Sequence, residues 1–204
     1  MSWRVELRCA GTGGQGLALA AVVLAEAGLA GGYEVALTQE YGPEARGGAS
    51  RADVVISDIP IADPHCGVPG ILLALHDKAW RRFAAGVPAV MSALGSGAMV
   101  AVVDRDRVAA DPGAPGVLAL AFEGVARDEL RAKVVANMIA VGAIGRLMAL
   151  FDAGVVESAV SKRSPGAFRE LNVVAFRRGW AMMDELLDVE RPQEVSAGAG
   201  VTRP

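Results

Sequence analysis

Residues 11–16 read Gly11-Thr12-Gly13-Gly14-Gln15-Gly16, and together with their neighbours they decide the fold. Val5 to Ala10 before them is short and strand-like, and Leu17 to Ala30 after them is a long apolar segment of good helix formers. A strand, a glycine-rich turn and a helix together begin an α/β unit. A helix start leaves N–H groups without partners, and its dipole favours negative charge. A phosphate or carboxylate is therefore the natural occupant of this turn.

The turn also fits a cofactor-binding pattern. The spacing Gly11-x-Gly13-x-x-Gly16 matches the dinucleotide fingerprint, and Glu40 lies about 24 residues further on, close to where that fingerprint places a ribose-binding carboxylate. A P-loop is disfavoured because no Lys-Ser or Lys-Thr pair follows Gly16. The alternative is a tight strand-to-helix turn that binds nothing.

The composition indicates one globular domain. The 204 residues suffice for a substantial core, and 52% hydrophobic but only 5% aromatic residues are typical of α/β layers rich in Ala, Val and Leu. A net charge of −3 gives no basic footprint for nucleic acid. Mean hydropathy of +0.35 is high, which suggests a membrane segment or a large interface. The segment 17–30 is too short to span a membrane and carries Glu26, so we expect a cytoplasmic protein with a buried interface.

Cysteine and histidine are scarce. Cys9 and Cys66 form no C-x-x-C pair, so the chain by itself is not expected to hold an iron–sulfur cluster. His65 and His76 are too few for an all-histidine metal site. We therefore predict no metal site in this chain.

The pattern of apolar residues predicts further elements. Strands are expected over residues 34–38, 52–57, 71–75, 98–103 and 117–121. Helices are expected over 77–85, with Asp77 as N-cap, over 126–150 and over 167–187. Gly142 and Gly145 lie near one face of the long helix, where close packing would explain them. We expect a single domain over residues 1–188 and a disordered tail over 189–204.

A second unusual stretch, residues 39–50, is expected to be a loop. It contains Tyr41-Gly42-Pro43-Glu44-Ala45-Arg46-Gly47-Gly48. Glycine and proline would fix its backbone path, and Arg46 could clamp a phosphate or carboxylate. The alternative is a surface turn in which Arg46 pairs with Glu44 or Glu40.

Three motifs in this order carry a family resemblance: the glycine turn, the Tyr41 to Gly48 element, and Asn137 to Ala143. Together they resemble the gamma subunit of 2-oxoacid:ferredoxin oxidoreductases, nearest to the 2-oxoglutarate synthase type. The resemblance runs from about Val5 to Met183, and the Tyr41 to Gly48 element is its most specific part. The segment from Gly86 to Gly97 departs from the family by being longer and more apolar.

The resemblance implies a fold and a reaction. The fold would be a three-layer α/β sandwich like domain III of pyruvate:ferredoxin oxidoreductase. The enzymes convert a 2-oxoacid, coenzyme A and oxidised ferredoxin to acyl-CoA, carbon dioxide and reduced ferredoxin. Thiamine diphosphate and [4Fe-4S] clusters would lie on partner subunits. The partners would be alpha and beta subunits, with a delta or ferredoxin-like subunit as a further candidate, and ferredoxin. The chain would not be active alone and would hold no catalytic residue.

The expected site follows from the same motifs. The residues expected to bind a coenzyme A phosphate or the substrate are Gly11, Thr12, Gly13, Gly14, Gln15, Gly16, Tyr41, Gly42, Glu44, Arg46, Gly47 and Gly48. Asn137, Gly142 and Gly145 are expected to serve packing, with Asn137 bonded to a neighbouring backbone group. A free-standing dinucleotide-binding oxidoreductase using Gly11, Gly13, Gly16 and Glu40, or a module that binds an anionic metabolite, is the alternative. The particular 2-oxoacid and the subunit stoichiometry stay open.

Overall fold

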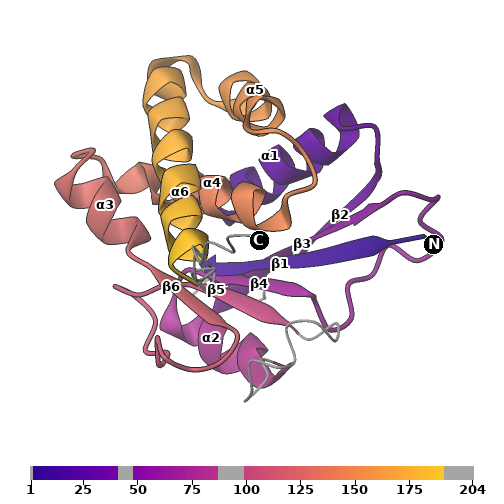
Figure 1. Ribbon diagram of the computed structural model, residues 1–204, viewed down its shortest axis with the longest axis horizontal. Helices are drawn as coiled ribbons and strands as arrows, with labels where there is room; N and C mark the ends of the chain where they lie inside the picture. Colours follow the sequence, from indigo (N-terminus) through magenta and orange to yellow (C-terminus); the bar gives the residue numbers. More distant parts are fainter. Residues whose placement is uncertain (1, 41–47, 87–98, 191–204) are drawn as a thin grey trace, which may run out of the picture.

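The computed structural model describes residues 2–40, 48–86 and 99–190. Its six-stranded sheet has the order β2-β3-β1-β4-β5-β6 (Figure 1). The strands are β1 (Arg4–Thr12), β2 (Glu34–Glu40), β3 (Ala49–Ser57), β4 (Ile71–Ala74), β5 (Val100–Asp104) and β6 (Val117–Leu120). β1, β4, β5 and β6 run parallel, whereas β3 is antiparallel to both β1 and β2. The predicted α/β class is confirmed.

Helices cover both faces of the sheet, which gives three layers (Figure 1). The larger core lies under α1 (Leu17–Ala30), α4 (Ala136–Met148), α5 (Ala153–Arg163) and α6 (Arg169–Glu190). On the other face, α2 (Asp77–Phe83) covers a smaller apolar cluster. Among the described helices, none is both long and apolar enough to cross a membrane.

The first helix has the predicted bounds. Gly16 begins it in the left-handed conformation, and Gly31 ends it. α1 packs on β2 and β3 below and on α4 and α5 beside it, so it is buried on several sides. This position explains why its sequence is apolar nearly all round. Its Glu26 pairs with Arg163 of α5.

The single helix predicted over 126–150 is wrong. The chain forms α3 (Phe122–Asp128), a 3-10 turn η3 (Lys133–Val135) and then α4. Between them Arg131 adopts φ 56°, and the Ala132 N–H returns to the Ala126 carbonyl at 2.8 Å. A left-handed residue ends a helix even where the sequence has no glycine or proline to announce it.

Other predicted boundaries also need correction. The N-cap of α2 is His76, whose side chain accepts the Lys78 N–H at 3.1 Å, and not Asp77. α2 ends at Phe83, and a 3-10 turn η1 (Ala84–Gly86) follows. The expected loop over 39–50 is shorter, because both of its ends belong to strands β2 and β3. α5 was not predicted, although the spacing of Val156, Ala159 and Val160 indicates it.

The last helix begins after a short 3-10 turn η4 (Gly166–Phe168) and runs to Glu190, beyond the predicted end at 187 and the predicted domain boundary at 188. Most of the tail prediction and nearly all of the segment 86–97 lie outside the described residues.

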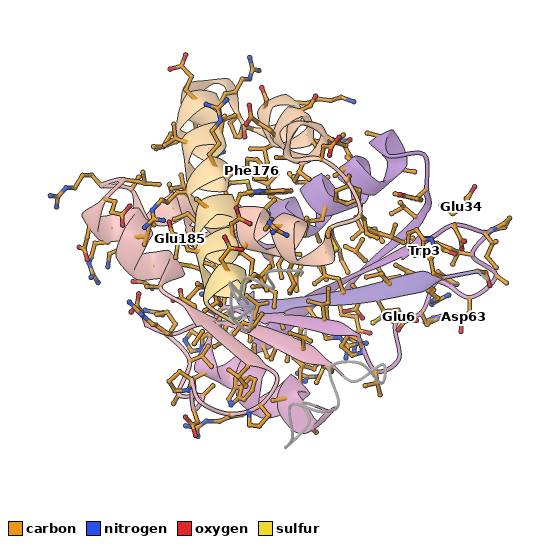
Figure 2. The ribbon with its side chains drawn as sticks, viewed as in Figure 1. Trp3, Glu6, Glu34, Asp63, Phe176 and Glu185 are labelled. Atoms are coloured by element: carbon orange, nitrogen blue, oxygen red, sulfur yellow. The ribbon has the colours of Figure 1, made fainter. Side chains whose placement is uncertain are left out.

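Helices α4 and α6 touch backbone to backbone. A Cβ added to Gly142 would lie 2.0 Å from the carbonyl oxygen of Phe176, which Figure 2 labels on α6. A Cβ on Gly179 of α6 would lie 1.8 Å from the Ile139 carbonyl oxygen. Gly145 is less tightly enclosed, with Trp180 at 3.3 Å. Glycine on both helices therefore sets how closely they approach.

Arginines of β1 hold the segment 58–70 against the sheet. Arg8 is buried, pairs with Asp53 at 2.8 and 2.9 Å, and donates to the Cys66 carbonyl at 3.0 Å. The hydrogen bond to Asp53 raises the pKa of Arg8 further. Arg4 bonds Glu6 and the Asp63 carbonyl; Figure 2 labels both residues at the N-terminal end of the sheet.

Candidate functional site

The carboxyl ends of the parallel strands meet at one edge of the sheet. The glycine turn leaves β1 there, Leu75 follows β4, Asp104 ends β5, and α3 begins just after β6. Ligands of open α/β sheets bind outside the carboxyl ends of the strands. A ligand site is therefore expected at this edge of the sheet.

The glycine turn presents free backbone donors. Gly14 has φ 85° and Gly16 has φ 69°, conformations that favour glycine. A Cβ on Gly13 or Gly14 would meet no described atom within 4 Å. Neither of their N–H groups is bonded to another described residue. Within the described part of the chain, the turn thus offers two unpaired N–H groups just before the start of α1.

The Gln15 side chain is used inside the chain. Its Oε1 accepts the Thr12 N–H at 2.7 Å and the Thr12 hydroxyl at 3.2 Å, and its Nε2 donates to the Leu75 carbonyl at 2.8 Å. A Cβ on Gly11 would lie 2.5 Å from Gln15 Oε1. Gln15 therefore braces the turn against the end of β4, and Gly11 leaves room for it.

The turn is held from a second side by Asn137. This side chain is buried in the first turn of α4, and its Nδ2 donates to the Gly16 carbonyl at 3.2 Å. A Cβ on Gly16 would lie 2.3 Å from the same nitrogen. The first and third motifs are thus in contact, whereas Gly142 and Gly145 lie further along α4 against α6.

Gly48, the last residue of the second motif, lies next to the glycine turn. Ala49 at the start of β3 is the ladder partner of Thr12, and Gly48 directly precedes it. Tyr41, Gly42, Glu44, Arg46 and Gly47 lie outside the described residues. Their flanking residues nevertheless belong to the same edge as the glycine turn.

Glu40 is not placed as a ribose ligand. In a dinucleotide fold the second strand lies directly beside the first, but here β3 separates β2 from β1. Glu40 instead pairs with Arg51, which lowers the pKa of the Glu40 carboxyl. This corrects the alternative that gave Glu40 a cofactor role.

A cavity of about 320 Å³ lies next to the turn. It is lined by Gly14, Gln15, Leu75, Asp104, Arg107, Glu123, Lys133, Val134, Ala136 and Asn137. Seven of these were not among the predicted site residues. Asp104 and Arg107 could have been found, because they follow a buried strand at its carboxyl end.

The charged groups of the cavity interact closely. Glu123 lies 3.2 Å from Arg107 Nε and 3.4 Å from Lys133 Nζ. Asp104 is buried, and its two oxygens accept the N–H groups of Asp106 at 3.2 Å and Glu123 at 3.1 Å. Burial raises the pKa of Asp104 to about 6. Within the described ranges, no three His, Cys, Asp or Glu side chains gather as metal ligands.

A glycine turn and a cavity lined in part by charged side chains, at the carboxyl edge of a three-layer sheet, define an α/β ligand-binding protein. The family described as pyruvate ferredoxin/flavodoxin oxidoreductase matches residues 6–182. The 2-oxoglutarate synthase subunit KorC of Methanocaldococcus jannaschii is 37% identical over 188 residues, which cover 90% of this chain and 96% of that protein.

Solved structures are also similar to this chain. The gamma subunit of a keto/oxoacid ferredoxin oxidoreductase from Geobacter sulfurreducens PCA has a TM-score of 0.73 and 36% identity, covering 89% of this chain and 99% of that one. The 2-oxoglutarate:ferredoxin oxidoreductase from Magnetococcus marinus, solved with coenzyme A bound, shares the fold at a TM-score of 0.71 and 21% identity, covering 89% of this chain and 31% of that one.

The chain belongs to the pyruvate ferredoxin/flavodoxin oxidoreductase family. It is the gamma subunit of a multi-subunit oxidoreductase, which confirms the identification made from the three motifs. Thiamine diphosphate, iron–sulfur clusters and coenzyme A are used by the complexes of this family.

Proposed function

We propose that this gamma subunit helps form the coenzyme A and substrate cavity of a cytoplasmic 2-oxoglutarate:ferredoxin oxidoreductase. Thiamine diphosphate and the [4Fe-4S] clusters are held by partner subunits of the complex. The gamma chain supplies binding groups and no catalytic residue, so it is inactive alone. The choice of 2-oxoglutarate rests on the similarity to the KorC subunit.

One juxtaposition supports this role most directly: at one edge of the sheet the first and third motifs are in contact, and Gly48, the last residue of the second motif, directly precedes the ladder partner of Thr12. Thr12 pairs with Ala49 beside Gly48, and Asn137 bonds the Gly16 carbonyl. The N–H groups of Gly13 and Gly14 are bonded to no other described residue. Coenzyme A carries several phosphate groups, which are the ligands that such donors favour.

The test is Gly13→Ala in the assembled complex. The new Cβ meets no described atom within 4 Å and Gly13 has no positive φ, so the fold is expected to be unchanged. A ligand that approaches this backbone would be displaced, and we expect the KM for coenzyme A to rise about tenfold. Steady-state assays with 2-oxoglutarate and ferredoxin measure it.

Gly154→Ala is the matched control, because its added Cβ on α5 also meets nothing within 4 Å. An unchanged KM for coenzyme A in the Gly13→Ala complex would contradict the proposed site. Arg46→Ala addresses the second motif in the same assay. It should raise the KM for coenzyme A or for 2-oxoglutarate, and unchanged kinetics would remove the role assigned to Arg46.

A further inference from the structure

Two cations from separate elements share one carboxylate in the cavity. Arg107 comes from the turn after β5, and Lys133 comes from η3. Both reach Glu123 of α3, at 3.2 and 3.4 Å. The Arg107 and Lys133 side chains are 41% and 63% exposed, so they lie at the mouth of the cavity rather than in the core.

These ion pairs are poorly explained as stabilising contacts. Exposed pairs contribute at most about 1 kcal/mol each and are readily exchanged for other partners. The second carboxylate of the cavity, Asp104, has its oxygens bonded to backbone N–H groups. Glu123 is therefore the anion that pairs with the two cations when no ligand is bound.

The glycine turn also lines this cavity. Gly14 and Gln15 are lining residues together with Arg107 and Lys133. The Gln15 N–H is bonded to the Thr12 carbonyl, whereas the Gly14 N–H is bonded to no other described residue. A phosphate, with several acceptor oxygens and more than one charge, can accept from this N–H and from both cations at once.

From this arrangement, and on the basis of the proposed function, we propose that Arg107 and Lys133 bind a phosphate of coenzyme A and that Glu123 competes with that phosphate for them. At about 320 Å³ the cavity lies at the small end of ligand sites, which run from roughly 300 Å³ upwards. It therefore accepts a phosphate-bearing end of coenzyme A and not the whole molecule. Glu123 keeps the two cations in place between turnovers.

The experiment measures the KM for coenzyme A in complexes carrying Arg107→Gln, Lys133→Gln or Glu123→Gln. Loss of either cation removes a charge-assisted contact and should raise the KM roughly fivefold to tenfold. Glu123→Gln removes the competing anion and should lower the KM about threefold. A carboxylate with only a structural role would not produce a lower KM when removed.

Arg177 and Glu157 supply matched controls, because they form a similar exposed pair between α6 and α5 at 2.6 Å. Arg177→Gln and Glu157→Gln should leave the KM unchanged. Dephospho-coenzyme A, which lacks the 3′-phosphate, distinguishes the phosphates of the ligand. If the cavity binds the 3′-phosphate, Arg107→Gln and Lys133→Gln should not raise the KM for this analogue. If the cavity binds the diphosphate, both variants should raise the KM for the analogue as they do for coenzyme A.

The proposal is supported if Glu123→Gln lowers the KM and at least one cation variant raises it. It is overturned if Glu123→Gln leaves the KM unchanged or raises it, if neither cation variant changes it, or if these variants fail to assemble with the partner subunits. Should Gly13→Ala raise the KM in any of those cases, the proposed function survives and only this assignment fails. If Gly13→Ala has no effect either, both fail.

Discussion

At the scale of single residues, Asp104 links the cavity to the pH dependence of stability. Its pKa is raised to about 6 from an ordinary value of 3.8, mainly by burial. Between pH 3.8 and about 6, the Asp104 carboxyl therefore keeps its proton in the folded chain but has lost it in the unfolded chain. The stability that this group contributes is fully present below about pH 3.8 and is lost as pH rises through about 6.

The corresponding prediction concerns Asp104→Asn. Between pH 5 and 7.5, deprotonation of Asp104 should lower the free energy of unfolding of the native chain by on the order of 1 kcal/mol. The variant has no carboxyl at this position, so its free energy of unfolding should not fall for this reason. Urea unfolding at both pH values measures the difference. The variant is also expected to be less stable overall, because an amide cannot accept both N–H groups that Asp104 accepts. An equal pH slope in both proteins would count against the raised pKa.

At the scale of elements, the packing of α4 on α6 depends on glycine. The more tightly a glycine is enclosed by its neighbours, the less a side chain is tolerated at its position. A Cβ would lie 2.0 Å from backbone at Gly142, 3.3 Å from the Trp180 ring at Gly145, and beyond 4 Å from everything at Gly154. Backbone cannot move aside as a side-chain end can, so the first position is the least tolerant.

Alanine substitutions at these three positions should therefore form a graded series. Gly142→Ala is expected to lower the free energy of unfolding by at least about 3 kcal/mol, Gly145→Ala by about 1 kcal/mol, and Gly154→Ala to leave it unchanged or slightly raised. Urea midpoints of the three variants measure this order. Equal losses at Gly142 and Gly154 would mean that the two helices do not touch as described.

The same scale shows what could be predicted from the sequence. The ends of α1 were predictable because glycine stands at both of them, at Gly16 and Gly31. The break between α3 and α4 was not, because Arg131 adopts a left-handed conformation without a glycine signal. The glycine turn was predictable as a local motif. Asp104 and Arg107 could have been added, because they stand at the carboxyl end of a buried strand. Glu123 and Lys133 join the site only through the order of the strands, which no local pattern specifies.

At the scale of the whole molecule, the antiparallel strand β3 places Gly48, the last residue of the second motif, next to the glycine turn. It lies between β2 and β1, so residues flanking the second motif emerge beside the turn that follows β1. Gly48 and the glycine turn, which are far apart in the sequence, thus lie at one edge of the sheet. Convergence of this kind suits a subunit that contributes one wall of a cavity shared with other chains.

That role predicts how the chain behaves in its host. Tagged at the C-terminus and isolated anaerobically, it should be recovered with a thiamine-binding subunit, and the preparation should reduce ferredoxin only when 2-oxoglutarate and coenzyme A are both present. Large apolar side chains at the surface, with Val68 75% and Val134 68% exposed, favour such partners, because they would lose contact with water in a complex. Recovery of a lone chain that binds a nicotinamide nucleotide would contradict this role. Since β3 separates Glu40 from the glycine turn, such a chain would have to bind its cofactor in a way that the described strand order does not provide.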